Sequence, residues 1–337
     1  MSTMQSAPAT LADVARVAGV SCATASRVLT GSARVRPETR RQVELAMADL
    51  GYVRNRAPRS ARTRTGSVAF VVCEENMRVF ADPFFARMLW SVSRELVAED
   101  MQLVLLTVHA PRDYRSVARY LRGGHVDGAL FVSVHGRLPL ELDQVGVPIV
   151  LAGRPMDPRS GLSYVDADNV GGAERAVRHL LDHGRTSIAT VAGPTDMNAG
   201  VDRLIGYRTA LVAAGVSDSG LVAYGDFGRI SGEHATNRIL DRRPGVDAVF
   251  AASDLMATGV LRALRRSGRR VPDDVAVIGF DDSPLAQHTE PQLTTVRQPI
   301  DAMGARMVAE LLTLVGNGDK PPSGVVLDTE LVLRDSA

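Results

Sequence analysis

The stretch LADVARVAGVSCATASRVLT, residues 11–30, predicts two short helices joined by a tight turn. Its first eight residues repeat apolar side chains at helical spacing, and Gly19 interrupts that pattern. Ser21 is a typical N-cap for the second helix, because its hydroxyl can accept a hydrogen bond from a backbone N–H of the first turn. Two short helices around a glycine-containing turn form a helix-turn-helix.

A third helix is expected next, because Pro37 suits the first position of a helix and Gly51 suits the position after its end. Apolar residues between them share one face, which can cover the first two helices and enclose a small core. An all-α head over residues 1–52 follows from this pattern. Residues 53–65 contain five arginines and few apolar side chains, so they are expected to form a linker, or a helix that forms only on binding.

The charge of the chain is unevenly distributed. Residues 1–65 carry eleven arginines and four acidic side chains, a net charge of +7, whereas the remaining residues carry a net charge of −6. A basic head on an acidic body indicates that the head binds a polyanion such as nucleic acid. The alternative is an arginine-rich face that contacts only water.

From Gly66 onward, apolar runs of strand length alternate with helical patterns. The runs begin with SVAFVV at residues 67–72 and include VAVIGFDD at residues 275–282, and the alternation restarts near residue 170. Alternating strands and helices predict a doubly wound parallel sheet, and the restart predicts two lobes with a cleft between them. The expected fold class is therefore a helix-turn-helix head and an α/β body of two doubly wound parallel-sheet lobes.

The sequence also argues against several classes of protein. No apolar run approaches the about 20 residues of a membrane span, and the first 20 residues lack the pattern of a secretory signal. Cys22 and Cys73 stand far apart without a disulfide or zinc spacing, which fits a reducing cytoplasm. No strand–helix turn carries a phosphate-binding glycine motif. We therefore expect a cytoplasmic protein with no membrane association, no metal and no cofactor.

Longer motifs follow one another in a fixed order in both parts of the chain. The head signature is followed in the body by ADPFF (81–85), VDGALFV (126–132), RLIGYRTAL (203–211), AVFAASDLMATG (248–259) and VPDDVAVIGFDD (271–282). Together these motifs resemble the LacI/GalR family of bacterial transcription regulators over nearly the full length of the chain. The resemblance implies a body similar to periplasmic binding proteins, whose chain crosses between the lobes three times.

The resemblance also implies domain bounds. The expected domains are a helix-turn-helix DNA-binding domain, residues 1–52; a hinge or linker, residues 53–65; an effector-binding N-lobe, residues 66–163 and 294–323; and an effector-binding C-lobe, residues 164–293 and 324–337.

In a helix-turn-helix, the N-terminal residues of the second helix face base edges in the major groove of DNA. Here those residues are Cys22 and Ala23, with Arg27 one turn further along. Arg27 can bind guanine through two hydrogen bonds, and the alternative is that it contacts only phosphate. Thr24 and Ser26 are expected to contact phosphate or to cap the helix.

In the family the linker folds into a hinge helix that enters the minor groove and wedges a leucine between base pairs. The matching positions here include Asn55, Arg56 and Arg59, which are expected to bind DNA. Ala61 stands where the family has leucine, and Pro58 stands in the first turn of the hinge helix. Because a methyl group cannot wedge as a leucine does, we expect weaker or absent kinking at the centre of the DNA site, with arginines supplying charge instead.

For the effector, Arg203 matches the arginine that family members use on their ligand, and Asp281 matches the acidic group. A guanidinium suits vicinal hydroxyls or a carboxylate, and a carboxylate at a strand end can accept hydrogen bonds from ligand hydroxyls. The expected effector-binding residues are Asp82, Phe84, Phe85, Arg203, Phe227, Ser253, Asp254 and Asp281.

Plainer explanations exist for three of these residues. Phe84 and Phe85 could pack in the hydrophobic core without contacting a ligand. Asp254 could instead cap the helix that begins at its position.

Departures from the family bear on which ligand is bound. Gly153 stands where many members have an aspartate, and Ser253 where they have an asparagine, and both residues usually bind sugar hydroxyls. Members that respond to purines carry an arginine six residues before the position of Arg203, where this chain has Met197. A purine is therefore disfavoured, and a sugar or sugar derivative is expected.

The function expected from these observations is an effector-switched, DNA-binding transcriptional regulator, with repression as the family's usual mode. A homodimer would read a pseudopalindromic operator in double-stranded DNA, one half-site for each head. The alternatives are a cytoplasmic solute-binding protein or an enzyme on the same fold. Against an enzyme, no histidine stands in a recognisable nucleophile or metal spacing.

Overall fold

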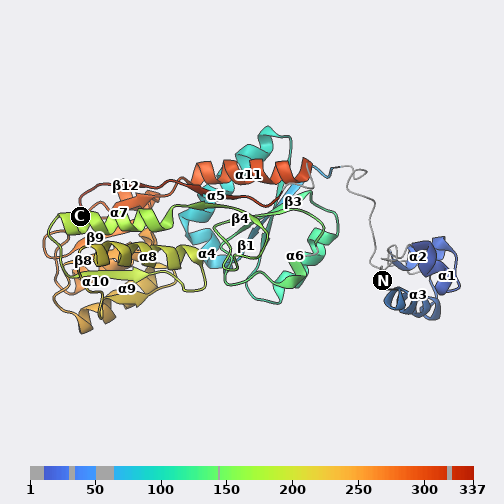
Figure 1. Ribbon diagram of the computed structural model, residues 1–337, viewed down its shortest axis with the longest axis horizontal. Helices are drawn as coiled ribbons and strands as arrows, with labels where there is room; N and C mark the ends of the chain where they lie inside the picture. Colours follow the sequence, from blue (N-terminus) through green and yellow to red (C-terminus); the bar gives the residue numbers. More distant parts are fainter. Residues whose placement is uncertain (1–10, 30–34, 51–63, 143–144, 317–320) are drawn as a thin grey trace, which may run out of the picture. The chain divides into compact units, whose positions relative to one another are not determined.

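The computed structural model describes residues 11–29, 35–50, 64–142, 145–316 and 321–337. The chain divides into two compact units, the head and the body. Each unit is described by itself below, and Figure 1 labels their helices and strands. The predicted hinge residues Asn55, Arg56 and Arg59 lie outside the described residues.

The described part of the head forms the expected helices. They are α1 (Leu11–Val17), α2 (Cys22–Leu29) and α3 (Pro37–Asp49). The Ser21 hydroxyl accepts a 3.1 Å hydrogen bond from the Thr24 N–H, so the predicted N-cap is present at the start of α2. Val14, Ala25 and Val43 meet in a small core to which all three helices contribute.

The N-lobe of the body is built on a six-stranded sheet of order β11-β5-β4-β3-β1-β2, in which every pairing is parallel. The strands are β1 (Ser67–Val72), β2 (Gln102–Thr107), β3 (Gly128–Val132), β4 (Ile149–Ala152), β5 (Ser163–Ala167) and β11 (Gly324–Leu327). Strands buried on both faces explain why the sequence has continuous apolar runs here.

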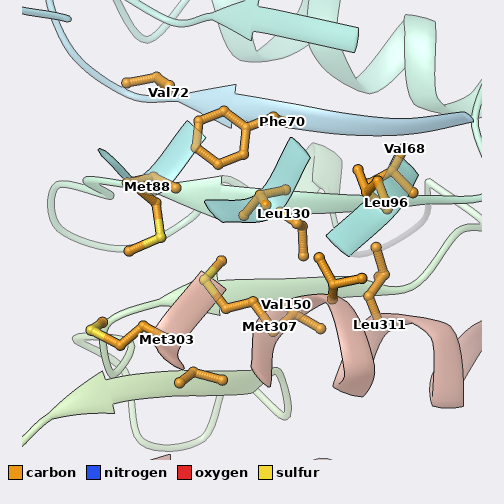
Figure 2. Packing of buried hydrophobic residues seen from close by; sticks show 14 of the residues in the cluster. Val68, Phe70, Val72, Met88, Leu96, Leu130, Val150, Met303, Met307 and Leu311 are labelled. Atoms are coloured by element: carbon orange, nitrogen blue, oxygen red, sulfur yellow. The ribbon is translucent and has the colours of Figure 1, made fainter. Parts of the chain in front are cut away.

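Helices cover both faces of this sheet (Figure 1). They are α4 (Asn76–Ala81), α5 (Pro83–Ala98), α6 (Asp113–Arg122), the 3-10 helix η2 (Leu140–Leu142) and α11 (Ile300–Gly316). Figure 2 shows the core between the sheet and helices α5 and α11, where Phe70 and Leu130 lie near Met88 and Met307. Helix α6 packs on the opposite face through Val117 and neighbouring residues.

The C-lobe repeats the arrangement with a six-stranded sheet of order β12-β10-β9-β8-β6-β7. The strands are β6 (Ile188–Ala192), β7 (Val222–Tyr224), β8 (Ala248–Ala251), β9 (Ala276–Asp281), β10 (Thr294–Arg297) and β12 (Glu330–Val332). Its pairings are parallel except at the edge, where β12 runs antiparallel to β10.

Helices also cover both faces of the C-lobe sheet. They are α7 (Asn169–Asp182) and α8 (Asn198–Ala213) on one face, and α9 (Arg229–Arg242) and α10 (Asp254–Arg266) on the other, with the 3-10 helix η3 (Pro284–Gln287) after β9. The two-lobed α/β body predicted from the alternation of strands and helices is therefore confirmed.

The expected lobe bounds are wrong at three strands. Strand β5, mostly assigned to the C-lobe by the bound at residue 164, pairs with β4 in the N-lobe. Strand β10 was expected in the N-lobe but pairs with β9 in the C-lobe, and β11 was expected in the C-lobe but pairs with β5. A strand belongs to the sheet that satisfies its backbone hydrogen bonds, and a bound inferred from family resemblance does not contain that information.

The observed crossings follow from this pairing. Within the described body, the chain passes between the lobes after β5, after β10 and after β11. The three crossings that the resemblance implied are therefore present, each a few residues later than expected. As a result, Asp168 and Gln298 lie in segments that connect the two lobes.

Candidate functional site

The predicted DNA-contacting residues of α2 lie together at its N-terminal half. Cys22, Ala23, Ser26 and Arg27 are exposed, while Thr24 is half-buried and bonded to the N-cap. Ala25 and Val28, on the opposite face of the helix, are buried in the head core. The helix thus packs with one face and presents the other to solvent, which is the arrangement a recognition helix needs.

In the body, a cavity of about 700 Å³ is lined by residues of both lobes. It lies at the carboxyl ends of the strands, where Ser133 follows β3, Gly153 follows β4, Ser253 follows β8 and Asp281 ends β9. Open α/β sheets bind ligands at this edge. Seven of the predicted effector-binding residues line this cavity, namely Asp82, Phe84, Phe85, Arg203, Phe227, Ser253 and Asp281.

Arg203 is the most constrained charged group of the cavity. Its side chain, on α8, is only 5% exposed. Its Nε donates a 2.9 Å hydrogen bond to Asn169 Oδ1, and its Nη1 donates a 2.6 Å hydrogen bond to the Ala252 carbonyl. The guanidinium also lies over the Phe280 ring, 3.7 Å from the centroid. These contacts hold the cation in one orientation before any ligand arrives.

Asp281 faces the same guanidinium from the end of β9. Its Oδ1 is 3.6 Å from Arg203 Nη1 and accepts a 2.6 Å hydrogen bond from Gln298 Nε2. Burial raises the pKa of Asp281 to about 7, although the Arg203 cation opposes that shift. The carboxyl therefore holds a proton more readily than an exposed aspartate does, and it lines the cavity.

Aromatic rings and one further carboxyl occupy the wall of the cavity that α5 and the loop after β7 contribute. Phe84 is half-buried and lies edge-on to Phe85, which is buried in the N-lobe core as well as lining the cavity. Asp82 caps α5 by accepting a 3.0 Å hydrogen bond from the Phe84 N–H, and burial raises its pKa. Phe227 lies 5.5 Å from the Arg203 guanidinium. Core packing and cavity lining are therefore compatible roles for Phe85.

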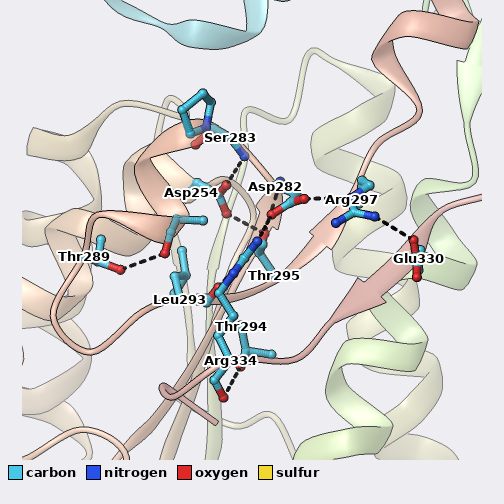
Figure 3. Close-up of polar contacts among 12 residues, drawn as sticks. Asp254, Asp282, Ser283, Thr289, Leu293, Thr294, Thr295, Arg297, Glu330 and Arg334 are labelled. Atoms are coloured by element: carbon cyan, nitrogen blue, oxygen red, sulfur yellow. Dashed lines mark hydrogen bonds and ion pairs between the residues drawn. The ribbon is translucent and has the colours of Figure 1, made fainter.

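Asp254 is the predicted effector residue that does not line the cavity. It is fully buried, and its carboxylate accepts a 2.7 Å hydrogen bond from the Ser283 N–H and a 2.5 Å hydrogen bond from the Thr295 hydroxyl (Figure 3). Burial raises its pKa to about 8, and the nearby Asp281 carboxylate adds to the shift. The effector contact expected at Asp254 stays a prediction, because its carboxylate is bonded to Ser283 and Thr295 and does not line the cavity in this structure.

Ser253, rather than Asp254, caps α10. Its hydroxyl accepts a 3.1 Å hydrogen bond from the Met256 N–H and donates to the Phe227 carbonyl at 2.9 Å. The hydroxyl thus ties the Phe227 loop to the helix start, and it borders the cavity with its donor already used.

Arg154, which was not among the predicted site residues, lines the cavity just after the carboxyl end of β4. Its guanidinium donates two hydrogen bonds, 2.7 and 2.6 Å long, to the two carboxylate oxygens of Asp202 on α8 of the C-lobe. Asn198 adds to this link by donating to the Arg154 and Pro155 carbonyls, each at 2.9 Å. The position of Arg154 after a strand end was a usable signal, because ligand sites gather there.

A buried polar chain connects this link to the centre of the cavity. The Arg154 N–H donates to Asp166 Oδ2 at 3.2 Å, and Asp166 Oδ1 accepts from Asn169 Nδ2 at 3.0 Å. Asn169 in turn accepts from Arg203. Asp166 and Asn169 flank the first crossing between the lobes. The Arg203 guanidinium is therefore bonded to the residue that directly follows this connecting segment.

The outer part of the cavity carries further arginines. Arg137 and Arg159 each place Nε 3.7 Å from a carboxylate oxygen of Asp157, and their side chains are 72% and 85% exposed. Such exposed pairs contribute little to stability. These exposed arginine side chains make the outer part of the cavity polar.

Within the described residues, no group of three or more histidine, cysteine and acidic side chains is arranged to hold a metal ion. Nor does any helix of that part of the chain have the length and apolar composition needed to cross a membrane.

Comparison with known families finds two matches in this chain. Residues 10–55 match the family described as bacterial regulatory proteins, lacI family, and residues 177–337 match the periplasmic binding protein-like domain. The first match covers the helix-turn-helix, and the second covers most of the C-lobe together with α11 and the edge strands.

Individual relatives match over nearly the whole chain. The transcriptional regulator CelR of Thermobifida fusca is 49% identical over 332 residues, which are 97% of this chain and 98% of that protein. The transcriptional repressor CytR of Escherichia coli K12 is 31% identical over 338 residues, 98% of this chain and 97% of that protein.

Solved structures match equally widely. A complex of CelR with cellobiose has a TM-score of 0.80 and 48% identity, with 98% of this chain and 100% of that chain covered. The lac repressor dimer bound to its operator and the anti-inducer ONPF has a TM-score of 0.71 and 26% identity, with 98% and 99% covered.

Proposed function

The chain belongs to the LacI family of bacterial regulatory proteins and is a DNA-binding transcriptional regulator, and from that premise we propose that it is a repressor controlled by a β-linked disaccharide such as cellobiose. The observation that carries the proposal is the convergence of Arg203, Asp281 and the rings of Phe84 and Phe227 on one cavity between the lobes. A sugar offers hydroxyls to the charged pair and a flat face to an aromatic ring.

The choice of a disaccharide rests on two supports. The similar regulator CelR, 48% identical, has been solved with cellobiose bound. The cavity here, about 700 Å³, extends from Arg203 and Asp281 to the outer loop of Arg137 and Arg159, which leaves room for more than one hexose ring. The inner end would hold one ring, and the outer arginines would contact the other.

For DNA, we assign base recognition to the exposed N-terminal half of α2. Arg27 would bind guanine, and Cys22 and Ala23 would contact base edges, with Thr24 and Ser26 near phosphate. Asn55, Arg56 and Arg59 would add hinge contacts. A dimer with two heads would read a pseudopalindromic operator, and its place of action would be the cytoplasm, where the chromosome lies. We propose no catalytic role, since close relatives are regulators.

The test combines sugar binding with DNA binding. Purified full-length protein is used to select fragments of genomic DNA from its source bacterium, at about 0.15 M salt because protein–DNA affinity depends on salt. The selected fragments are footprinted with and without cellobiose, and calorimetry measures the binding of cellobiose, glucose and maltose separately. Release of a discrete pseudopalindrome by cellobiose supports the proposal. Operator binding that no sugar alters, together with no calorimetric signal, would overturn the sugar assignment.

A further inference from the structure

His135 makes a polar contact between the two lobes that the effector site does not use. It stands in the loop after β3, between the cavity-lining residues Val134 and Gly136. Its Nε2 lies 3.1 Å from Glu74 Oε1, just after β1 in the N-lobe. Its Nδ1 lies 3.0 Å from Asp196 Oδ2, in the loop after β6 of the C-lobe. One imidazole ring therefore stands between carboxylates of different lobes.

The chemistry of the ring determines which protonation state fits this position. A carboxylate only accepts hydrogen bonds, and a neutral imidazole has a single N–H to donate. Both nitrogens of His135 face carboxylate oxygens at hydrogen-bond distance. The geometry is therefore satisfied by the imidazolium, whereas the neutral ring would place a lone pair against one of the carboxylates.

The N-lobe side of this contact is fixed in place. Glu74 is 8% exposed, accepts a 2.8 Å hydrogen bond from the Ser133 hydroxyl and pairs with Arg78 at 3.3 Å. The His109 ring contacts the Glu74 carbonyl at 2.8 Å. These partners all belong to the N-lobe, so Glu74 is held by contacts within its own lobe.

The C-lobe side is more exposed. The Asp196 side chain is 55% exposed, and its backbone carbonyl accepts a 2.7 Å hydrogen bond from the Gly136 N–H. The hydrogen bond to Glu74 raises the pKa of His135, burial opposes it, and Asp196 raises it further. Arg78 is the nearby cation that partly neutralises Glu74. Asp196 is therefore the more exposed of the two carboxylates that His135 contacts.

We propose that His135 is a positioning residue for the effector site. As an imidazolium, its ring joins Glu74 of the N-lobe to Asp196 of the C-lobe beside the cavity. The inference rests on the proposed function, because it concerns the lobe arrangement to which the sugar binds. His135 does not line the cavity itself. It therefore acts by holding the loop after β3 in place relative to the loop after β6.

The sign of the pH effect follows from the proton count. The bridge is complete below the raised pKa of His135 and loses one of its two carboxylate bonds as the pH rises through that pKa. Burial also raises the pKa of Asp281, which lines the cavity and can contribute its own pH dependence to sugar binding. Asp281 is present in both proteins when the wild type is compared with a His135 variant, so the ratio of their affinities isolates His135.

The first experiment measures cellobiose affinity by calorimetry on the full-length chain from about pH 6 to about pH 8.5, the range in which a histidine titrates. We expect His135→Gln to bind cellobiose about two- to fivefold more weakly than wild type at the acid end, as for a partly exposed ion pair, and equally at the alkaline end. His234→Gln, at an exposed position on α9, is the matched control and should follow the wild type. If the ratio of the cellobiose affinity of wild type to that of His135→Gln did not change with pH, the proposal would be overturned.

The second experiment needs no sugar, so it separates failure of this inference from failure of the sugar assignment. Proton NMR of the imidazole signals gives the pKa of His135 in the wild type and in Asp196→Asn. We expect a pKa above the ordinary histidine value of about 6.5 that falls in Asp196→Asn. If cellobiose does not bind but this shift is present, the bridge stands and the ligand is different. If the His135 pKa were unshifted and the same in both proteins, the imidazolium bridge would be ruled out.

Discussion

Arg27 in the head and Arg203 in the body are arginines that the sequence marks for recognition, and their surroundings are opposite. Arg27 is exposed on α2, beside Ala23 and Ser26 at the helix surface. Arg203 is 4% exposed, hydrogen-bonded to Asn169 and to a backbone carbonyl, and faced by a carboxylate. The first residue lies at the surface of the head, and the second is held within the fold of the body.

This difference in burial determines how much each binding residue also contributes to the stability of the folded protein. A buried cation must be paired and hydrogen-bonded, so its partners lose their compensation when it is removed. An exposed cation keeps its hydration in the free protein, so its removal changes binding and little else. Substitutions of the two arginines should therefore have separable effects, and the predictions below test that separation.

The largest effect is expected for Arg203→Ala. Removing the guanidinium takes away the donor to buried Asn169 Oδ1 and the cation that faces buried Asp281, and breaking a buried pair costs about 3–5 kcal/mol of unfolding free energy. Urea unfolding measures this loss, and calorimetry should show no cellobiose binding. Operator binding by the head should persist under conditions in which the Arg203→Ala variant remains folded.

The matched control for Arg203→Ala is Arg159→Ala, because Arg159 also lines the cavity but is 85% exposed. Its unfolding midpoint should stay close to that of the wild type. Equal destabilisation by both substitutions would mean that burial does not distinguish the two kinds of arginine. Asp281→Asn, which keeps the shape of the site, should weaken sugar binding even if Arg203→Ala proves too unstable to assay.

A smaller effect is expected where an exposed arginine meets a buried carboxylate. Arg154 is 45% exposed, whereas the Asp202 side chain is 8% exposed. Arg154→Ala should cost about 1–3 kcal/mol of unfolding free energy, since it leaves a buried acceptor unpaired. Asp202→Asn should cost less, because Arg154 can then turn to water. Chemical denaturation of both variants tests the asymmetry, and a reversed order would contradict it.

Arg27→Ala should reduce stability much less than Arg203→Ala, because Arg27 is exposed, and should alter recognition at one base pair of each half-site. A bidentate arginine–guanine contact discriminates against other bases by about 1–3 kcal/mol. Competition binding with operators mutated at single positions measures this preference. A uniform loss of affinity on every sequence would instead identify Arg27 as a phosphate contact.

The smallest expected effect is that of Arg59→Ala, a sequence-based prediction for a residue outside the described part of the chain. If Arg59 contacts phosphate, affinity should fall equally on all sequences. The slope of log affinity against log salt should then decrease by about one. Titrations at four salt concentrations, with Arg27→Ala in parallel, distinguish this behaviour from base recognition, and an unchanged slope would exclude the phosphate contact.

Local signals in the sequence were sufficient for the head. The glycine turn, the Ser21 cap and Pro37 each act within one helical turn, and the structure places helices at these positions. In the body, motifs similar to those of the family identified seven residues that line one cavity. The same motifs also selected Asp254, which does not line the cavity although the adjacent Ser253 does, because the two side chains leave the helix start in different directions.

The sequence by itself determined the order of elements, the two-part organisation and the charged and aromatic residues of the cavity, because these follow from local periodicity and from motifs in a known order. Only the tertiary structure decided which sheet holds β5, β10 and β11, and which partners Arg154 and His135 find across the lobes. Those partners are separated by 48 and 61 positions along the chain. Contacts of that kind depend on how two sheets pack and connect, and no local pattern of residues encodes them.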